Sequence, residues 1–461
     1  MRIGSKKLKA KKICYSFLQV IFAAYFAIFV LIFYFLISSS PSWSDIFSTN
    51  HVSVLKNRPS EIKKDIIVDV ALLDTNGGID TLTKNLVEKI AQKRPEWRLN
   101  ILFSEITNKK LLEVRSLPNV NMIRVNPWYN KMQEALFEII NFATFGIFRN
   151  KFLQIIFYDT IFLDSSCNLF WDPVSGDCVN DFIMPKITTI HDIGFIDYPE
   201  MAPPTRSEWV KKRNKKTVKF SDKIVTVSEF SKKRIVAEYK LNDNFVQAIP
   251  IRLGKRLNQN LSAEDINLTL KKFNIVSKEY VIFVSQFYKH KNHERLIQAF
   301  SKFIKNNQNS NFKKIKLLIV GNMVHSRGEI QKFAEKYKTD DNIIFTGMVS
   351  NKDLQTLMSQ ALFFIHPSLY EGFGMPIIEA MDNGIPVTCS NAASLPEVAG
   401  DAALFFNPED VDSIESAIKI VTENSNLRQQ LIERGHEHAQ KFTNTNEMAD
   451  EYIKLFEKTM R

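Results

Sequence analysis

Cysteine is scarce in this chain of 461 residues, and its four copies follow no spacing pattern. They stand at Cys14, Cys167, Cys178 and Cys389. Four unpatterned thiols are typical of a reducing compartment, or of a chain under no redox constraint, so they give no evidence of a disulfide framework. A bridge between Cys167 and Cys178 would require this part of the chain to lie in an oxidising lumen.

Metal-ligand patterns and internal repeats are also missing. The only acidic cluster that invites a metal, Asp410-Val411-Asp412, follows an Asn-Pro pair and is typical of a helix start. The rest of the composition is 45% hydrophobic and 24% charged, which is ordinary for a globular protein with a large core. The length predicts two or three domains.

Acidic residues are absent from the first twelve positions, which hold six basic ones. The net charge of the chain is +11, from 61 basic and 50 acidic residues. Beyond position 12 the 55 remaining basic residues exceed the acidic ones by only five. Such a mild excess gives no support for a nucleic-acid partner.

One long hydrophobic run stands out at residues 13–37, where no side chain is charged. A helix of this length spans about 37 Å, enough to cross a bilayer with some tilt. The run is too long for a signal peptide, and the SSSPSWSD sequence after it is a poor cleavage site. We predict a basic tail over 1–12, a single transmembrane anchor over 13–37 and a polar stem over 38–62. A buried core helix is the alternative for the anchor.

The stem is followed by a first series of strands and helices. A strand pattern over 65–73 leads through Gly77 and Gly78 into a helical pattern over 81–94, the opening unit of a Rossmann-like domain. Further strand patterns occur at 99–103, 188–190 and 223–227. We predict a first Rossmann-like domain over 63–255.

A second series begins near Tyr280. Strand patterns at 280–284, 316–320, 342–345, 361–366 and 386–389 alternate with helical patterns at 294–305, 327–337, 352–358 and 376–381. This alternation predicts a parallel sheet. We expect a second domain over 256–440 and a C-terminal helix over 441–461 that returns to the first.

Two glutamates eight residues apart mark the loop after the fourth of these strands, in the sequence YEGFGMPIIEA at 370–380. Gly372 and Gly374 allow backbone amides to approach a ligand closely. Pro376 suits the first position of a helix, and Glu379 is then expected in its first turn. A helix N-terminus binds phosphate, and two carboxylates beside it accept hydrogen bonds from hydroxyls. The pattern predicts a sugar-nucleotide site.

These residues resemble family 4 of the glycosyltransferases, whose motif E-G-F-G-x-x-x-x-E they match at each fixed position. The resemblance implies a GT-B fold, with two Rossmann-like domains facing across a cleft, and retaining transfer without a metal. It implies that Glu371 contacts the transferred sugar and Glu379 the ribose. The segment Gly372, Phe373 and Gly374 would face the sugar and the distal phosphate, and the Gly77-Gly78 loop would approach the phosphates from the first domain.

A phosphate-binding lysine is expected where the first strand of the second domain ends. Lys291 in the sequence SQFYKHKN is expected to open the next helix, where its ammonium would neutralise a diphosphate. It aligns with the lysine of the family. Five residues earlier, where the family often has arginine, this chain has Gln286.

The first domain resembles the family at two further places. His191-Asp192 ends a buried strand, where ligands of α/β sheets bind, and the family places this histidine beside the donor sugar. Ser228 and Ser231 resemble a V-S-x-x-S segment, for which a helix N-cap and direct ligand contact are both open. The sequence LPEVAGD at 395–401 completes the resemblance, which covers residues 65–458.

We therefore expect a membrane-anchored hexosyltransferase with His191, Glu371 and Lys291 as catalytic residues. The arrangement HDIGFIDYPE at 191–200 resembles that of family members that use GDP-mannose, and this resemblance implies GDP-mannose as donor before UDP-hexoses or dTDP-rhamnose. The acceptor would be a glycan or a lipid-linked saccharide, and no metal or other cofactor is expected. The alternative, favoured by Gln286, is a catalytically silent nucleotide-sugar-binding scaffold. A sugar-nucleotide epimerase is a third option.

The membrane side of the catalytic domain stays open. The basic tail predicts a cytoplasmic N-terminus, which would place the domain across the membrane. Bacterial nucleotide sugars are cytoplasmic, and a cytoplasmic enzyme whose hydrophobic segment lies in or re-enters one leaflet would be consistent with both observations. A eukaryotic enzyme with its catalytic domain in the lumen would instead agree with the cytoplasmic N-terminus that the basic tail predicts.

Overall fold

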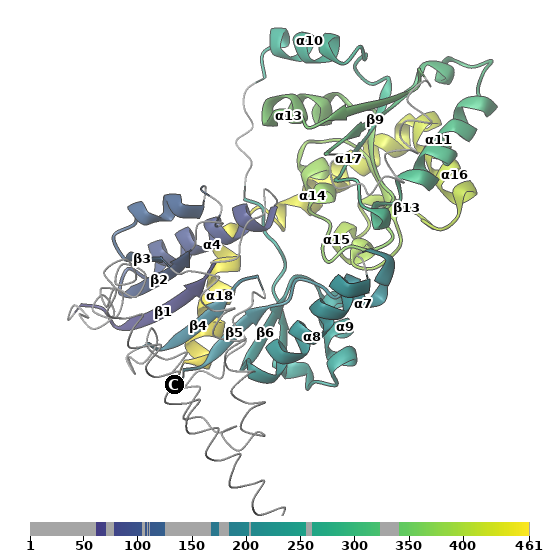
Figure 1. Ribbon diagram of the computed structural model, residues 1–461. Coiled ribbons are helices and arrows are strands. Elements are labelled where there is room, and N and C mark those ends of the chain that lie inside the picture. The colour runs from purple at the N-terminus through teal and green to yellow at the C-terminus, as the bar shows by residue number, and fades with distance from the viewer. Residues whose placement is uncertain are drawn as a thin grey trace, which may run out of the picture.

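Two parallel α/β units make up the part of the chain that the computed structural model describes, which is residues 61–70, 78–103, 107, 109, 111–124, 167–174, 184–201, 204–254, 261–322 and 341–460. Figure 1 shows them as two lobes, the first coloured purple to teal and the second green to yellow. The predicted helix at 327–337 and Cys178 lie outside these residues.

The first unit contains a seven-stranded sheet in the order β3-β2-β1-β4-β5-β6-β7, and each neighbouring pair is parallel. Its strands are β1 (Lys64–Asp69), β2 (Trp97–Phe103), β3 (Val120–Arg124), β4 (Leu169–Asp172), β5 (Lys186–Thr189), β6 (Lys223–Thr226) and β7 (Val246–Ala248). Its helices are α4 (Gly78–Lys93), α7 (Gly194–Asp197), α8 (Pro204–Phe220) and α9 (Glu229–Tyr239). Short 3-10 turns are η1 (Leu111–Ser116), η2 (Pro199–Met201) and η3 (Asp243–Phe245).

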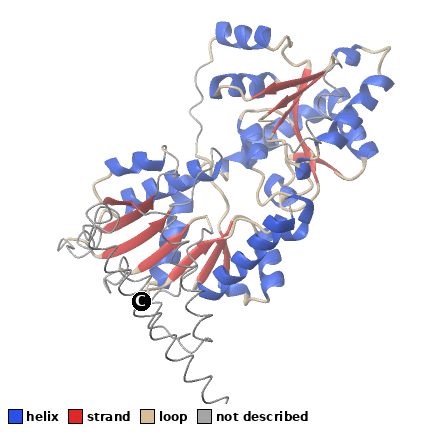
Figure 2. Cartoon of the chain, in the orientation of Figure 1, coloured by secondary structure: helices blue, strands red, loops and turns tan. Residues whose placement is uncertain are grey.

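The second unit contains a six-stranded parallel sheet in the order β10-β9-β8-β11-β12-β13. Its strands are β8 (Tyr280–Val284), β9 (Lys316–Val320), β10 (Ile343–Gly347), β11 (Phe363–His366), β12 (Val387–Ser390) and β13 (Ala403–Phe406). The helices are α10 (Ala263–Lys272), α11 (His293–Asn306), α13 (Asn351–Gln360), α14 (Met375–Asp382), α15 (Leu395–Ala399), α16 (Val411–Glu423) and α17 (Ser425–Gln440), with the turns η4 (Lys289–Lys291) and η5 (Asn311–Lys314). Figure 2 shows the two sheets between their helices.

Strand β8 shows why the second sheet is covered on both faces. Its sequence YVIFV is apolar throughout, as expected for a central parallel strand. Tyr280 and Ile282 belong to the core on one face, which includes residues of α14. Val281 and Phe283 belong to the core on the other face, under α11 and α16. Because successive side chains of a strand point to opposite faces of the sheet, the residues of β8 alternate between the two cores.

The last helix, α18 (Thr445–Thr459), lies on the first sheet although the chain reaches it from the second unit. Phe456 is fully buried, and its ring lies 5.3 Å from that of Trp171 and 6.5 Å from that of Trp97. Lys93 in α4 forms an ion pair with Asp450 at 2.8 Å. The C-terminal helix therefore belongs to the core of the first unit.

The predicted membrane anchor falls at residues 13–37, outside the described residues. Within the described ranges, no helix has both the length and the apolar character needed to span a bilayer.

Candidate active site

The candidate site lies where β8 and β11 end, side by side in the middle of the second sheet. The order of strands along the chain reverses here, since β8 continues to β9 on one side and β11 continues to β12 on the other. Loops diverge at such a switch point, and ligands of α/β sheets bind there. The β8 loop carries Lys291 and the β11 loop carries Glu371.

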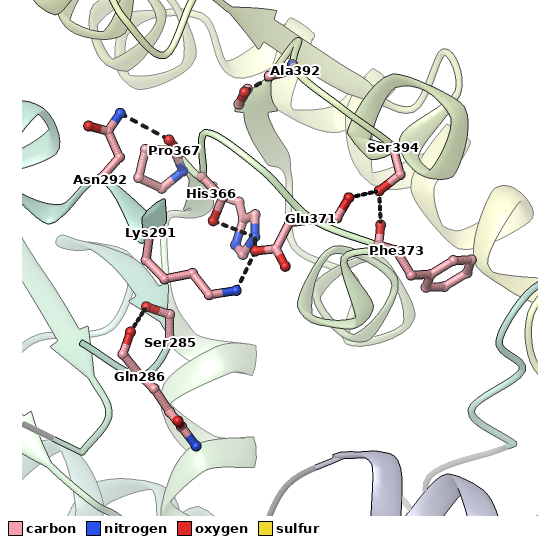
Figure 3. Close-up of polar contacts among 12 residues, drawn as sticks. Ser285, Gln286, Lys291, Asn292, His366, Pro367, Glu371, Phe373, Ala392 and Ser394 are labelled. Atoms are coloured by element: carbon pink, nitrogen blue, oxygen red, sulfur yellow. Dashed lines mark hydrogen bonds and ion pairs between the residues drawn. The ribbon is translucent and has the colours of Figure 1, made fainter. Parts of the chain in front are cut away.

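Lys291 and Glu371 form a close ion pair across these two loops. The Lys291 Nζ atom lies 2.6 Å from Glu371 Oε1, and both side chains are largely buried, with 17% and 13% of their surface exposed. His366, the last residue of β11, places its Nε2 atom 2.9 Å from the same carboxylate oxygen. Figure 3 shows both contacts converging on Glu371.

The electrostatics of this group hold Glu371 in its ionised form. Burial by itself raises the pKa of Glu371, but the Lys291 charge and the His366 hydrogen bond outweigh burial and bring that pKa well below its usual range. Burial lowers the pKa of His366, and the nearby carboxylate only partly offsets this effect. The site at neutral pH therefore contains one carboxylate, one ammonium and a neutral imidazole.

Asn292 ties the two loops together below the ion pair. It is buried, and its Nδ2 group donates to the carbonyls of Pro367 at 3.1 Å and Pro408 at 2.7 Å. The Leu369 amide donates to the His290 carbonyl at 2.8 Å. These bonds fix the backbone on which Lys291 and Glu371 stand.

Residues 367–374, between β11 and α14, form the loop that carries Glu371, here called the glutamate loop. Ser394 holds the end of this loop that leads into α14. Its hydroxyl is fully buried and lies 2.9 Å from the Glu371 carbonyl and 3.1 Å from the Phe373 carbonyl. Gly374 then turns the chain into α14 with φ at +103°, where an added Cβ would lie 2.7 Å from Leu395. Glycine is required at this turn because both its backbone conformation and its space exclude a side chain.

The first unit presents His191 and Asp192 from the loop after β5. His191 Nε2 lies 3.1 Å from the Pro173 carbonyl, and because a carbonyl only accepts, Nε2 carries the hydrogen. Burial lowers the pKa of His191 to about 4, so the ring is neutral at pH 7. A Cβ added to Gly372 would meet Asp192 Oδ2 at 2.7 Å, so the two loops touch across the units.

The N-terminus of α9 contacts the same glutamate loop. Ser228 Oγ caps the helix by accepting from the Ser231 amide at 3.1 Å, and donates to the Gly372 carbonyl at 2.7 Å. Glu397 from α15 accepts from the amides of Glu229 and Phe230 at 2.8 and 2.9 Å. The V-S-x-x-S segment is thus a helix cap and a contact between the units.

Comparison with known proteins identifies the family. Residues 265–438, which hold the sheet, the loops and the ion pair described above, match the family model described as glycosyl transferases group 1. Over this segment the chain is a group 1 glycosyltransferase.

Several curated relatives of this glycosyltransferase have similar names. The chain is 30% identical over 257 residues to O-antigen chain mannosyltransferase B of Escherichia coli, covering 56% of this chain and 66% of the relative. It is 29% identical over 236 residues to O-antigen chain mannosyltransferase RfbU of Salmonella typhimurium, covering 50% and 59%. A serotype-specific mannosyltransferase WbdA of Escherichia coli matches at 29% over 214 residues, 45% of this chain and 26% of the relative. The matches thus span less than two thirds of each relative.

Solved structures confirm the predicted GT-B fold. Sucrose-phosphate synthase from Thermosynechococcus elongatus superposes with a TM-score of 0.64 at 18% identity, over 86% of this chain and 99% of that one. Anabaena Alr3699/HepE in complex with UDP and glucose superposes with a TM-score of 0.62 at 16% identity, over 86% and 100%. Identities this low show the fold alone.

Some predicted site residues of the glycosyltransferase lie elsewhere than expected. Glu379 is the fifth residue of α14, beyond its first turn, because the helix begins at Met375 rather than at Pro376. Lys291 ends the turn η4 and does not open α11, which begins two residues later. The Phe373 ring is buried in the core, 5.7 Å from the ring of Phe442.

The remaining predicted donor-binding residues are Gln286, Gly77 and Gly78. Gln286 is exposed on the β8 loop (Figure 3). Gly78 is the first residue of α4, and Gly77 lies outside the described residues. His366, Asn292 and Ser394 were not predicted from the sequence. His366 could have been found only as a polar residue at the end of an otherwise apolar predicted strand.

Proposed function

We propose that this glycosyltransferase moves a hexose, with mannose preferred, from a nucleotide sugar to a glycan or lipid-linked acceptor, with retention of configuration and without a metal ion. The single observation that carries the proposal is the buried Lys291–Glu371 pair at the switch point, opposite the His191–Asp192 loop. This pair offers a cation for a diphosphate and a carboxylate for sugar hydroxyls in one place.

Lys291 and the N-terminus of α14 would stabilise the departing diphosphate. The ammonium supplies a full positive charge, and the helix adds its dipole. Glu371 and the neutral His191 would position the sugar as it becomes oxocarbenium-like. The acceptor hydroxyl, held by the first unit, then attacks the face that the diphosphate leaves. Its oxygen forms the new glycosidic bond, and its proton passes to the departing diphosphate. Glu379 would bind the ribose.

The choice of mannose rests on the relatives, several of which are named as mannosyltransferases. Two of these names also contain the words O-antigen chain. We therefore propose GDP-mannose as donor and a growing surface polysaccharide as the class of acceptor.

A donor panel tests the proposal. The purified protein is incubated with GDP-mannose, UDP-glucose, UDP-galactose or dTDP-rhamnose and saccharide acceptors, and nucleotide release and product are measured. We expect turnover with GDP-mannose, unchanged by EDTA, and a product whose anomeric configuration by NMR matches the donor. Donor binding without turnover across the panel would favour the scaffold, and an altered free nucleotide sugar would indicate an epimerase.

Lys291→Ala is the sharpest site variant. Loss of an electrostatic group that stabilises the transition state costs about 10²–10³-fold in kcat, and Glu371→Ala should lose activity similarly. Lys289→Ala is the matched control, since Lys289 is exposed on the same turn η4, and it should retain activity. Activity that survives both site substitutions would overturn the assignment.

We also propose that residues 13–37 attach the enzyme to a membrane. A chain that begins after residue 60 should leave the membrane fraction, whereas the full chain should stay in it until detergent is added. Protease digestion of sealed membranes would determine on which side the catalytic domain lies.

A further inference from the structure

Glu371 has its two carboxylate oxygens in different situations. Oε1 accepts from both Lys291, at 2.6 Å, and His366, at 2.9 Å. Within the described part of the chain, Oε2 has no hydrogen-bond partner. The protein thus fixes the carboxylate by one oxygen and leaves the other for a ligand hydroxyl.

Lys291 has two competing electrostatic partners in the proposed reaction, Glu371 and the donor diphosphate. Its ammonium holds Glu371 in this structure and would be needed at the diphosphate of a bound donor. A diphosphate carries more charge than one carboxylate, and Lys is a mobile point charge on a flexible stem. Glu371 would then lose its cation while buried, a situation that favours uptake of a proton. A protonated carboxyl no longer accepts with both oxygens.

We propose that His366 is a positioning residue that keeps Glu371 in place when a donor diphosphate draws Lys291 away. The inference rests on the proposed function and concerns a residue that makes no contact with donor itself. His366 would hold Oε1, while Oε2 stays available to the sugar.

The surroundings of His366 fix its imidazole in place as a hydrogen-bond donor to Glu371. The side chain is fully buried at the end of β11, with the rings of Phe283 and Phe364 each 5.8 Å away and Ser368 Oγ 3.2 Å from Nε2. Because a carboxylate only accepts, Nε2 carries the hydrogen. The other nitrogen, Nδ1, is buried and has no hydrogen-bond partner among the described residues. The ring therefore holds one proton, aimed at Glu371.

The other groups that face Glu371 do not replace the cation. Burial and the Lys291 charge lower the pKa of His290, on the β8 loop, to about 4, so this ring is neutral. Asp192, from the first unit, is acidic, and burial raises its pKa. His366, neutral as well, offers a hydrogen bond and not a charge. That bond is what remains to Glu371 once Lys291 moves.

Three variants separate this role from simple packing. His366→Phe keeps an aromatic ring between Phe283 and Phe364 but removes the donor, and His366→Leu is a second apolar variant should the first fail to fold. His366→Gln restores an N–H near the position of Nε2. His293→Phe is the matched control, since His293 is also buried and stacked, 4.3 Å from the Phe287 ring, but bonds to Ser285 rather than to a carboxylate.

The first measurement is proton uptake on binding GDP, with UDP in parallel, by calorimetry in two buffers of different ionisation enthalpy at about pH 6. We expect little uptake in the native protein, in His366→Gln and in His293→Phe, and up to about one proton per GDP in His366→Phe. Uptake in His366→Phe equal to that of the native protein would overturn the inference.

The second measurement is the pH profile of transfer. Glu371 must be ionised, so activity falls as pH drops through its pKa, and loss of the His366 bond raises that pKa. The acid limb of kcat should move to higher pH in His366→Phe and return in His366→Gln, while nucleotide affinity stays within about threefold. An unmoved acid limb would show that His366 only packs. If the native protein binds neither GDP nor UDP, it is the proposed function that fails, and the inference falls with it.

Discussion

At the scale of single residues, Gly372 lies at a close contact between the two units. A Cβ at this position would lie 2.7 Å from Asp192 Oδ2 and 3.0 Å from Asp192 Cβ, and both atoms belong to the other unit. Asp192 is itself fixed, because its Oδ1 accepts from the Gly194 amide at 2.9 Å. The added methyl group must therefore push the loops apart.

Gly372→Ala should lower kcat/KM by at least about tenfold, the effect of roughly 1.4 kcal/mol in transition-state stabilisation, with little change in thermal stability. Steady-state kinetics and thermal melting of the variant check this. If the clash is the cause, the double variant with Asp192→Gly, which removes both clashing atoms, should be no less active than Asp192→Gly alone. Additive losses would instead place the effect within the second unit.

Local sequence shows which residues have side chains suited to the proposed reaction, but it does not show which of these side chains contact one another. Lys291 and Glu371 were both predicted, yet their 2.6 Å contact depends on β8 and β11 being neighbours, and strand order is a property of the whole sheet. His366 and Ser394 have no distinctive spacing, since a buried histidine or serine is common in any core. Their role appears only when the carboxylate and the two carbonyls are seen beside them.

At the scale of elements, α9 is one of the parts of the first unit that reach the glutamate loop. Ser228 both caps this helix and donates to the Gly372 carbonyl, and Glu397 of α15 accepts from its first amides. From the residue types, the sequence left a helix cap and direct ligand contact both open. It contained no sign of the contact with a loop 144 positions away.

Ser228→Ala separates these two functions when it is compared with Ser350→Ala. Ser350 caps α13 by accepting from the Asp353 amide at 3.0 Å and lies within the second unit. Each substitution should lower the free energy of unfolding by about 1 kcal/mol through loss of the cap, measured by urea denaturation. Only Ser228→Ala should also reduce kcat/KM, by about fivefold for one hydrogen bond. Equal activity losses would show that the contact between the units is unimportant.

At the scale of the whole molecule, the chain passes from the second unit back to the first just before α18. The Leu253 amide donates to the Phe442 carbonyl at 2.9 Å, and Arg252 contacts Glu447 and Glu451, each at 3.2 Å. The Phe442 ring also packs on Phe373 of the glutamate loop. The segment that passes from the second unit to the first thus contacts the glutamate loop through Phe442. The relative position of the two units and the conformation of that loop are therefore coupled.

Because α18 completes the core of the first unit, damage to it should appear far away in sequence. Phe456→Ala removes a fully buried ring and should cost about 3–5 kcal/mol. In hydrogen exchange, peptides of β1, β2 and β4 should lose protection, while those of β8 and β11 keep it. Phe300→Ala, which empties a buried position in the second unit, should show the reverse pattern. Lys454→Ala, on the exposed side of α18, should leave both patterns unchanged. Loss of protection in β8 and β11 from Phe456→Ala would mean that the two cores unfold as one, and that α18 stabilises the site as well as the first sheet.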